Sequence, residues 1–561
     1  MVFRRIFGMV LLLLVPPLPA SFVCAESIPG LGTADFPTST HSEAAEHEFT
    51  RGLLLLHLFE YDDAVSSFIA AERADPGFAM AYWGEAMTFN HPIWNELDAR
   101  AGQAALAKFG PTAEARAQRI ADPRERAWFS AVEILYSGDG SKPDRDARYA
   151  RAMQLLSEAY PHDDEAQLFY ALALLGKSEG VRDIPTYLQA AAIAKAVFSR
   201  NPDHPGAAHY WIHAMDDPQH AAGALVPARA LSKIAPSAAH AQHMCSHIFL
   251  ALGMWDDVVK ANLAASRVMN QQAAAAGRPP IRCGHSHYWL EYGYLEQGKI
   301  SDARQVVAAC RAEAMQPGMA AKARAIVDPD DAEVSSFVEM RARYLVDTGR
   351  WRDEVAGWKV DMGDALLSKF IDAFATGFAA AESGDLPTAR NALATLDKLL
   401  PRLPAAFDSA GTPADDSGRQ VPRIQKLQLQ AVILAGEGHN DQAIVLARQA
   451  VAAGETFPYA FGPPSPEKPS YELLGELLLK EGKNAPAMRA FQASLDQAPL
   501  RTESLLGLLR AERAMGDKTA AAKTSRLLLR IWNNADADSI ERSEIQKQSA
   551  AASNAASNIE K

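Results

Sequence analysis

Cysteine, regular β-patterning and long apolar runs are all scarce in this sequence. Only four of its 561 residues are Cys, which leaves room for few disulfides. Alternation of Val, Ile and Thr with polar residues is rare, and this disfavours a sheet-rich fold. No Gly-rich phosphate loop, nucleophile elbow or dinucleotide fingerprint occurs. Beyond the first segment, no stretch is both long and apolar enough to cross a bilayer, which excludes a multi-span membrane protein.

Basic residues are outnumbered by acidic ones. The chain has 56 Lys and Arg against 68 Asp and Glu, a formal net charge of −12. A general nucleic-acid binder needs a basic surface, so we expect no nucleic-acid partner. Apolar residues make up 48% of the chain and charged residues 22%. This is ordinary globular composition and excludes a collagen-like or disordered chain.

The first 25 residues have the pattern of a cleaved secretory signal peptide. Arg4 and Arg5 precede an apolar run at residues 9–15, and Ala25 ends a cleavage pattern of small residues. A lipoprotein signal using Cys24 is an alternative, although the three residues before it match a lipobox poorly. We therefore expect a periplasmic or secreted protein that has no membrane span once the signal is removed.

Cleavage at this point leaves three cysteines, Cys245, Cys283 and Cys310. In an oxidising compartment, Cys283 and Cys310 are the obvious candidates for a disulfide. The simpler interpretation is that all three are small buried hydrophobic side chains.

A 34-residue repeat runs through the chain. In a unit that starts at Ala45, Gly52, Ala64, Phe68 and Pro76 occupy positions 8, 20, 24 and 32. Small residues at positions 8 and 20 let two helices approach closely, the aromatic residue fills the gap to the next unit, and Pro ends the second helix. The same spacing recurs downstream at Gly475, Ala487, Phe491 and Pro499, and again at Gly377, Ala389 and Pro401.

This period predicts an all-α, tetratricopeptide-type solenoid. Helix–turn–helix units would stack into a right-handed superhelix whose first helices line a concave groove. We expect a lead-in at residues 26–44 and a central array at 45–400 that carries most of the histidines. C-terminal repeats at 401–545 and a disordered tail at 546–561 would follow.

Histidine is concentrated in one part of this array, because nine of the fifteen lie between residues 204 and 287. Two consecutive units, starting at residues 205 and 239, each place a His at positions 5 and 9, which face the groove. These are His209 and His213 in the first unit and His243 and His247, 34 residues later, in the second, with His240 adding position 2. Each i, i+4 pair lies on one face of its helix.

Imidazoles presented in this way are typical metal ligands. Packed helices lie about 8–10 Å apart, so rings from both units can converge on a common ion at about 2.0–2.1 Å. Asp216, Asp217 and His220 either complete the ligand set or orient the rings from outside it; alternatively, the two carboxylates cap the helix end. The predicted metal residues are therefore His209, His213, His240, His243, His247, Asp216, Asp217 and His220.

A ligand set rich in His favours copper, zinc, iron or nickel over magnesium or calcium. Such a site would store or sense the metal, or would catalyse an oxidation or hydrolysis if a coordination position stays open. Whether the chain is an enzyme is left open. One alternative is a periplasmic scaffold that binds a protein or peptide in its groove without metal, and another is a pH-sensitive or purely structural His cluster.

The remaining histidines are weaker candidates. His285 and His287 form an H-x-H pair that can add one ligand, although the two rings diverge in a helix. His57 and His91 also face the groove, but we expect them to be distant in the array and not to be ligands. The solvated histidines are predicted to be His41, His47, His162 and His439.

Five blocks of the sequence resemble a family of exported bacterial tetratricopeptide-repeat proteins. Three of them are His-Tyr-Trp-Ile-His at 209–213, Asp-Asp-Pro-Gln-His at 216–220 and His-Ala-Gln-His-Met-Cys-Ser-His-Ile-Phe at 240–249. The others cover residues 78–86 and 462–476, the latter beginning Gly-Pro-Pro-Ser-Pro-Glu-Lys-Pro-Ser. The resemblance implies the solenoid and the His/Asp blocks. In this family a Pro usually stands where the chain has Cys245.

The Pro-rich segment at residues 462–469 is the last feature with two interpretations. It precedes a repeat helix that carries Glu472 and Glu476, and its prolines stiffen an extended connection. It is either an inter-repeat spacer that sets the stacking of neighbouring units or a lid at the rim of the groove.

Overall fold

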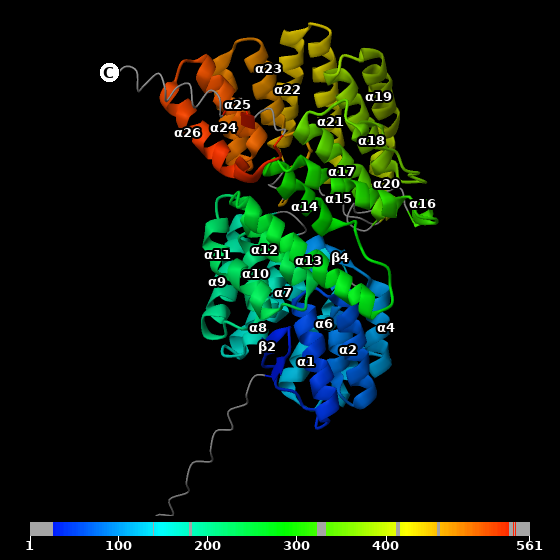
Figure 1. Ribbon diagram of the computed structural model, residues 1–561. Helices are drawn as coiled ribbons and strands as arrows, with labels where there is room; N and C mark the ends of the chain where they lie inside the picture. Colours follow the sequence, from blue (N-terminus) through cyan, green and yellow to red (C-terminus); the bar gives the residue numbers. More distant parts are fainter. Residues whose placement is uncertain are drawn as a thin grey trace, which may run out of the picture.

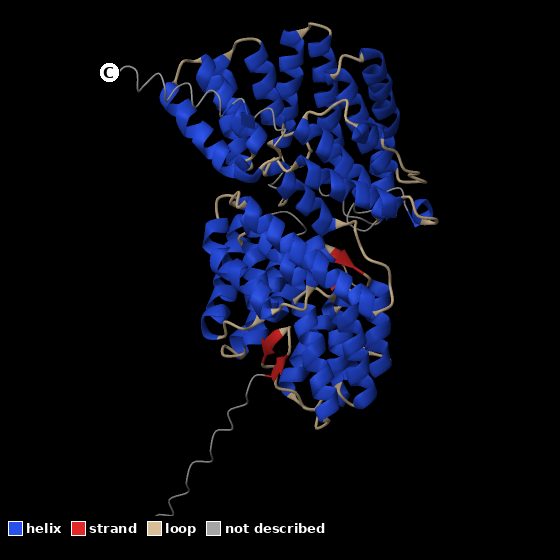
Figure 2. Cartoon of the chain, in the orientation of Figure 1, coloured by secondary structure: helices blue, strands red, loops and turns tan. Residues whose placement is uncertain are grey.

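The computed structural model of the chain describes residues 26–138, 140–178, 182–322, 332–410, 416–456, 461–537, 542–543 and 545. The described residues form an all-α structure in which consecutive helices pack against each other along the chain (Figures 1 and 2). The predicted all-α, tetratricopeptide-type solenoid is therefore confirmed. The predicted signal peptide at 1–25 and the tail at 546–561 lie outside the described residues.

The first half of the chain forms one lobe, coloured blue to green in Figure 1. Its helices are α1 (Glu43–His57), α2 (Tyr61–Ala74), α3 (Ala79–Met87), α4 (Ala99–Phe109), α5 (Ala113–Arg119), α6 (Pro123–Tyr136), α7 (Lys142–Ala159), α8 (Asp164–Gly176), α9 (Ile184–Arg200), α10 (Pro205–Ala214), α11 (Leu225–Ile234), α12 (Ala239–Ala251) and α13 (Trp255–Ala275). The units predicted to start at residues 205 and 239 begin at those residues.

The second half forms the upper lobe in Figure 1, coloured green to red. Its helices are α14 (His285–Glu296), α15 (Ile300–Ala314), α16 (Met319–Lys322), α17 (Glu333–Thr348), α18 (Leu366–Glu382), α19 (Leu386–Leu399), α20 (Leu403–Ala410), α21 (Asp416–Gly436), α22 (Asn440–Gly454), α23 (Ser470–Lys480), α24 (Asn484–Gln497), α25 (Thr502–Ala514) and α26 (Lys518–Ile531).

Two short antiparallel hairpins interrupt the helices. Strands β1 (Glu26–Ile28) and β2 (Gly32–Ala34) pair with Ser27 opposite Thr33, and β3 (Asn90–His91) pairs with β4 (Glu96–Leu97). The first hairpin is bound to the turns that precede α10 and α12. The Thr33 N–H donates to the Asp203 carbonyl (3.1 Å) and the Ser237 N–H to the Gly30 carbonyl (3.1 Å). The lead-in segment thus anchors the two helices that carry the paired histidines.

The first lobe curves so strongly that helices from its first and fifth pairs, α1 and α10, lie side by side. Helix α1 lies against α10, and the His209 ring Nδ1 is 2.6 Å from the His57 carbonyl oxygen. Residues more than 150 positions apart are therefore neighbours. This closure encloses the groove faces of α10 and α12, which is why the site below is buried.

The spacing of the repeat is explained by contacts around one aromatic side chain. Phe68 is fully buried, and a Cβ added at Gly52 or Gly84 would lie 2.9 Å or 2.2 Å from its ring. Phe491 is held in the same way between Gly475 and Gly507. The glycines of two successive first helices thus make room for the ring that joins them.

Replacing Phe68 with Ala is expected to lower the free energy of unfolding by about 3–5 kcal/mol, because the two glycines cannot fill the cavity that the ring leaves. Urea denaturation followed by circular dichroism measures this change. Val226, whose side chain is 65% exposed, provides the control, since Val226→Ala should leave stability within about 0.5 kcal/mol. Equal effects of the two substitutions would contradict the assigned packing.

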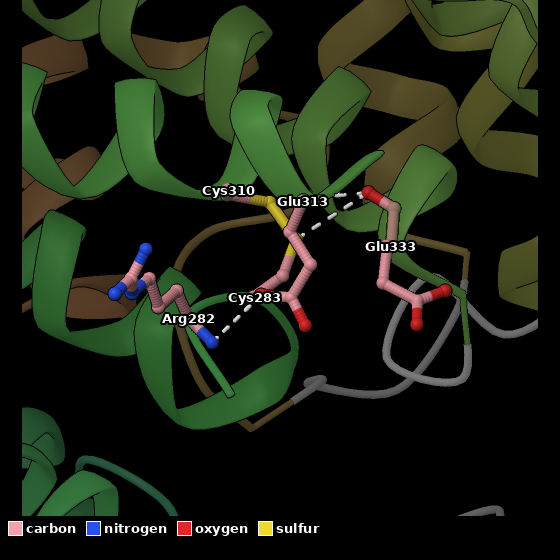
Figure 3. The surroundings of a disulfide bond; sticks show 5 residues. All are labelled: Arg282, Cys283, Cys310, Glu313 and Glu333. Carbon is pink, nitrogen blue, oxygen red and sulfur yellow. Dashed lines mark hydrogen bonds between the residues drawn. A yellow bond between two sulfur atoms is a disulfide. The ribbon is translucent and has the colours of Figure 1, made fainter. Parts of the chain in front are cut away.

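Cys283 and Cys310 form a disulfide, and Cys245 is free and buried. The interpretation of all three as free buried thiols is therefore wrong for two of them, and the pairing alternative is correct. Figure 3 shows the bond next to the backbone of Glu333. Beside it, the Arg282 N–H donates to the Glu313 carboxylate (2.8 Å). The bond ties the segment before α14 to α15.

Within the described part of the chain, none of the helices combines the length and apolar character that a bilayer span requires.

Candidate metal centre

The first helices of three consecutive pairs, α10, α12 and α14, bring six histidines together. Helix α10 contributes His209 and His213 one turn apart, and α12 contributes three more, beginning with His240. Helix α14 contributes its first residue, His285. The six form two groups of three, in each of which one ring nitrogen per residue lies within 4.8 Å of the others. The first group, triad 1, is His209, His213 and His240, and the second, triad 2, is His243, His247 and His285.

The sequence left open whether the histidines of the two helices share one ion or hold two, and the structure arranges them as two groups. The four histidines at positions 5 and 9 are divided between the triads, and each triad is completed by a residue near the start of the next first helix. The triads adjoin each other, since the ring centroids of His213 and His247 are 6.0 Å apart and those of His240 and His243 are 6.3 Å apart.

Triad 2 contains two imidazoles whose tautomers are determined by their neighbours. The Nδ1 of His247 is 2.6 Å from Oδ2 of Asp216, and the Nδ1 of His243 is 2.7 Å from Oδ1 of Asn262. Asn262 uses its own amide N–H to donate to the Val258 carbonyl (2.9 Å), which leaves its oxygen as the acceptor. When both rings are neutral, they therefore donate from Nδ1, and both Nε2 atoms carry a lone pair.

These two Nε2 atoms are 3.1 Å apart. Two lone pairs at this distance repel each other unless a proton or a metal cation lies between them. Two nitrogens bound to one ion at 2.0–2.1 Å are separated by about 2.9–3.4 Å over the range of angles from square to tetrahedral. The observed separation is in this range.

Triad 1 has the same construction. The Nδ1 of His209 donates to the His57 carbonyl oxygen (2.6 Å), so its Nε2 carries the lone pair. This Nε2 is 3.1 Å from the Nε2 of His213. The Nε2 of His240 is buried and has no hydrogen-bond partner, while its backbone N–H donates to the Glu60 carboxylate (3.0 Å).

Burial keeps four of these rings, His209, His213, His240 and His243, in the neutral form, which is the form that binds metal. Burial lowers the pKa of His209 to about 3. Burial, reinforced by neighbouring imidazoles, holds the pKa values of His213, His240 and His243 well below the usual 6.5. An isolated His cluster on a surface would instead titrate near neutrality.

Aromatic side chains surround both triads. The ring of Phe59 lies 4.4 Å from His209 and 5.7 Å from His240, measured between centroids. On the other side, Trp289 lies 4.3 Å from the His247 ring and Phe461 lies 5.4 Å from it. These apolar walls reduce the access of bulk water to the six nitrogens.

The three other predicted metal residues do not join the triads. Asp216 orients His247 through the hydrogen bond to Nδ1, which is the outer role considered for it. Asp217 accepts from Arg182 (2.8 Å) and lies 2.8 Å from the Nδ1 of His220. Asp217 also accepts from the backbone N–H of residues 219 and 220, so its carboxylate stabilises the turn after α10.

A third group of possible ligands, His57, Glu165 and His204, lies behind triad 1. It is a hydrogen-bonded chain: the Nε2 atoms of His57 and His204 are 2.7 and 2.9 Å from the two Glu165 oxygens, and the Tyr210 hydroxyl is 2.8 Å from the His57 Nδ1. Burial alone raises the pKa of Glu165, but the two imidazoles outweigh it and hold that pKa below its usual value. Hydrogen bonds therefore satisfy both Glu165 oxygens without an ion.

The expectation that His57 is distant from the paired histidines is wrong. Closure of the first lobe brings α1 against α10, so the His57 carbonyl orients His209. His91 is nearby as well, since it stacks on Tyr61 at 4.0 Å and lies beside Trp94. It belongs to neither triad.

The H-x-H pair diverges as its helical spacing requires. His285 joins triad 2, whereas the Nε2 of His287 is 3.1 Å from the Ser266 hydroxyl on α13. The repeat positions 5 and 9, from which the metal ligands were predicted, did not point to His285, because His285 is the first residue of its helix. Asn262 was not predicted either, and only its place beside His243 reveals its role. The four histidines expected to be solvated, His41, His47, His162 and His439, are exposed.

The Pro-rich segment 462–469 lies beside triad 2, because Phe461, the residue before it, packs against the His247 ring. Arg343, which is fully buried, donates to the Glu467 carbonyl (2.7 Å) and to the Pro464 carbonyl. Gly462 has φ +94° and lies so close to Trp289 that an added Cβ would be 2.8 Å from the indole. The segment is thus both a spacer fixed to α17 and a cover beside the His247 ring. The thiol of Cys245 faces the Ala241 carbonyl and stays outside both triads.

No protein-family model matches the chain, and no curated protein matches it. Among solved structures it is similar to human IFIT1, solved as a dimer with m7Gppp-AAAA (12% identity, 89% of this chain and 92% of that one, TM-score 0.34). It is also similar to yeast Tom70 (9% identity, 91% and 95%, TM-score 0.28) and to the TPR domain of P58(IPK) (12% identity, 85% and 99%, TM-score 0.21). The order and sequential packing of its own helices make the chain a helical-repeat protein of tetratricopeptide type, and its buried histidines form groups able to hold metal.

Proposed function

We propose that the chain binds two transition-metal ions side by side, one in each His triad, and that this paired centre is its functional site. Triad 1 would hold its ion through His209, His213 and His240. Triad 2 would do so through His243, His247 and His285. Asp216, Asn262 and the His57 carbonyl orient three of these rings from behind, an arrangement common around metal-bound imidazoles.

One observation carries this proposal. In triad 2, two Nε2 atoms face each other at 3.1 Å, and both Nδ1 atoms are already paired with oxygen acceptors. Burial opposes protonation of His243. A cation that accepts electron pairs from both nitrogens resolves the repulsion.

The ligand type favours copper, zinc, iron or nickel, because all six donors are imidazoles. Three protein ligands leave at least one coordination position open on each ion. Structural zinc sites are usually closed by four protein ligands, whereas catalytic sites keep a position for water or substrate. The paired triads therefore favour a reactive centre over a purely structural one.

Burial supports a metal centre over a groove that binds a peptide through histidine. His209 is 0% exposed, and His243 and His247 are each 3% exposed. A peptide contacts side chains that are accessible in the free protein, whereas these rings are covered by Phe59 in the turn after α1, by Trp289 on α14 and by Phe461.

Export of the protein is part of the proposal. The residues before Ala25 have the pattern of a signal peptide, and the Cys283–Cys310 disulfide is typical of oxidising compartments.

Elemental analysis of the mature protein, produced without a His-tag, tests the proposal. The metal-free chain is incubated in turn with copper, zinc, iron and nickel, and excess ion is removed before measurement. We expect two ions per chain for at least one of these metals. A correctly folded chain that retains none of the four would contradict the proposal.

A further inference from the structure

His285 is the triad ligand that begins its own helix. It is the first residue of α14, and the residue before it, Gly284, caps the helix without a side-chain hydrogen bond. The N–H groups of a first helical turn have no partner within the helix. His243 and His247 instead lie inside α12, with helical residues on both sides. The position of His285 therefore depends on the segment that leads into it, residues 276–284.

Two residues near the end of this segment are held by hydrogen bonds. The Ile281 N–H donates to the Asn270 side-chain oxygen on α13 (2.7 Å), and the Asn270 amide donates back to the Ile281 carbonyl (3.2 Å). The Arg282 N–H donates to the Glu313 carboxylate on α15 (2.8 Å). These bonds fix the approach to α14, but they end three residues before His285.

The residue between these bonds and the helix cap is Cys283, which is bonded to Cys310 on α15 (Figure 3). Both cysteines are buried, and they belong to one apolar cluster of the second lobe together with Val307 and Phe337. The disulfide is thus a covalent anchor two residues from His285.

Triad 2 joins the two lobes. Two of its imidazoles come from α12 in the first lobe, and the third, His285, comes from α14 in the second. The disulfide ties the start of α14 to α15, which belongs to the second lobe as well. A complete ligand set at triad 2 therefore requires that α14 begins at the right place.

Triad 1 has a different anchor. Its third ligand, His240, is the second residue of α12, and the His240 N–H donates to the Glu60 carboxylate (3.0 Å). All three ligands of triad 1 lie in the first lobe, whereas both cysteines of the disulfide lie outside it. Triad 1 therefore provides an internal control for the effect of the disulfide.

We infer that the Cys283–Cys310 disulfide positions His285 and makes the metal affinity of triad 2, but not that of triad 1, depend on the redox state of the protein. This role rests on the proposed metal centre. A dithiol reductant supplies two electrons and two protons: the S–S bond breaks, two thiols form, and the dithiol becomes a cyclic disulfide. The segment is then held by the hydrogen bonds at Ile281 and Arg282 alone.

Without a fixed third ligand, triad 2 retains the two imidazoles of α12. Its metal affinity should fall at least tenfold, since loss of an orienting contact costs about 10–100-fold. Disulfides persist in oxidising compartments and are rare in the cytoplasm. Triad 2 would therefore reach its full affinity after export, once the bond has formed.

Two routes give the protein without the bond. Cys283→Ser with Cys310→Ser removes the disulfide together with the thiols that could themselves bind metal. Wild-type protein reduced with dithiothreitol, which is then removed under nitrogen, serves if this variant does not fold. Circular dichroism verifies the helical content of both forms.

Zinc affinity, measured by competition with a chromogenic chelator, tests the two triads separately. In the full-length protein, His209→Ala with His213→Ala leaves triad 2, and His243→Ala with His247→Ala leaves triad 1. Each is compared with and without the disulfide. We expect the affinity to fall at least tenfold at triad 2 and to change less than twofold at triad 1. No fall at triad 2, or an equal fall at both, would overturn the inference.

Hydrogen exchange of the metal-free full-length protein gives a readout that needs no metal. The His287 and Tyr288 N–H groups donate to the Gly284 carbonyl (3.0 and 3.1 Å), so they report on the first turn of α14. Without the disulfide they should exchange at least tenfold faster. The Gln242 N–H, which donates to the Ala238 carbonyl (3.3 Å) at the start of α12, should be unchanged. Equal rates with and without the bond, or equal acceleration at Gln242, would overturn the inference.

Failure of the proposed function gives a different result. If the oxidised protein takes up none of the four metals, the proposed metal centre is wrong. If it takes up another metal but no zinc, the exchange rates in the first turn of α14 alone decide whether the disulfide positions His285.

Discussion

Replacing His209 and His213 together with Ala is expected to reduce the metal content from two ions per chain to one. Each substitution removes one of the three imidazoles of triad 1, and the remaining His240 cannot retain an ion through purification. Affinity at triad 1 should fall by more than about 100-fold, given that loss of even an outer contact costs about 10–100-fold. Triad 2 keeps its three ligands. Elemental analysis and titration with the native metal measure both values.

The reciprocal pair, His243→Ala with His247→Ala, should leave the ion of triad 1 and remove the other. His162→Ala with His439→Ala is the matched control, since both side chains are exposed, and it should retain two ions. If either double substitution removed all bound metal, the result would indicate one ion shared by the four histidines at positions 5 and 9 of the two repeats. Circular dichroism verifies that each variant is folded.

Mild acid is expected to unfold the metal-free protein. Burial lowers the pKa of His209 to about 3, and burial also lowers the pKa values of His57, His213 and His243. In the unfolded chain these groups titrate near 6.5. Above pH 6.5 they are neutral in both states. As the pH falls below 6.5, these histidines become protonated in the unfolded chain but stay neutral in the folded protein. The free energy of unfolding therefore decreases.

Each such His costs about 1.4 kcal/mol per pH unit over this window. Because the unfolded chain is already half protonated at pH 6.5, His209, His213 and His243 together remove roughly 5 kcal/mol between pH 6.5 and 5, which is comparable with the lower end of the stability of about 5–15 kcal/mol of a typical domain. We expect a cooperative transition near pH 5, followed by circular dichroism at constant ionic strength. Glu165 has a lowered pKa, so its contribution is present above about pH 4.5 and lost only at lower pH.

Bound metal should shift this transition to lower pH, because the ions bind the folded state and compete with protons for the same nitrogens. The exposed pair His162→Ala with His439→Ala should leave the curve of the metal-free protein unchanged. Stability that stays constant from pH 7 to 5 would be inconsistent with neutral buried imidazoles.

Much of the architecture could be read from the chain itself. The 34-residue period placed the first helices at residues 205 and 239, because small residues, one aromatic and a Pro recur where two packed helices demand them. The same period aligned His209 with His243 and His213 with His247. These are local consequences of helical geometry, and the structure has both helices beginning where the period predicted them.

The division into two triads was decided only in three dimensions. His240 and His285 lie at helix starts, where the repeat period says nothing about which neighbour they meet. The groups that orient the rings come from elsewhere: the His57 carbonyl is 152 residues from His209, and Phe461 reaches His247 from the other half of the chain. These contacts depend on curvature accumulated over many repeats. A sequence period defines the repeating unit, but the small rotation between units, summed along the array, determines which distant surfaces meet.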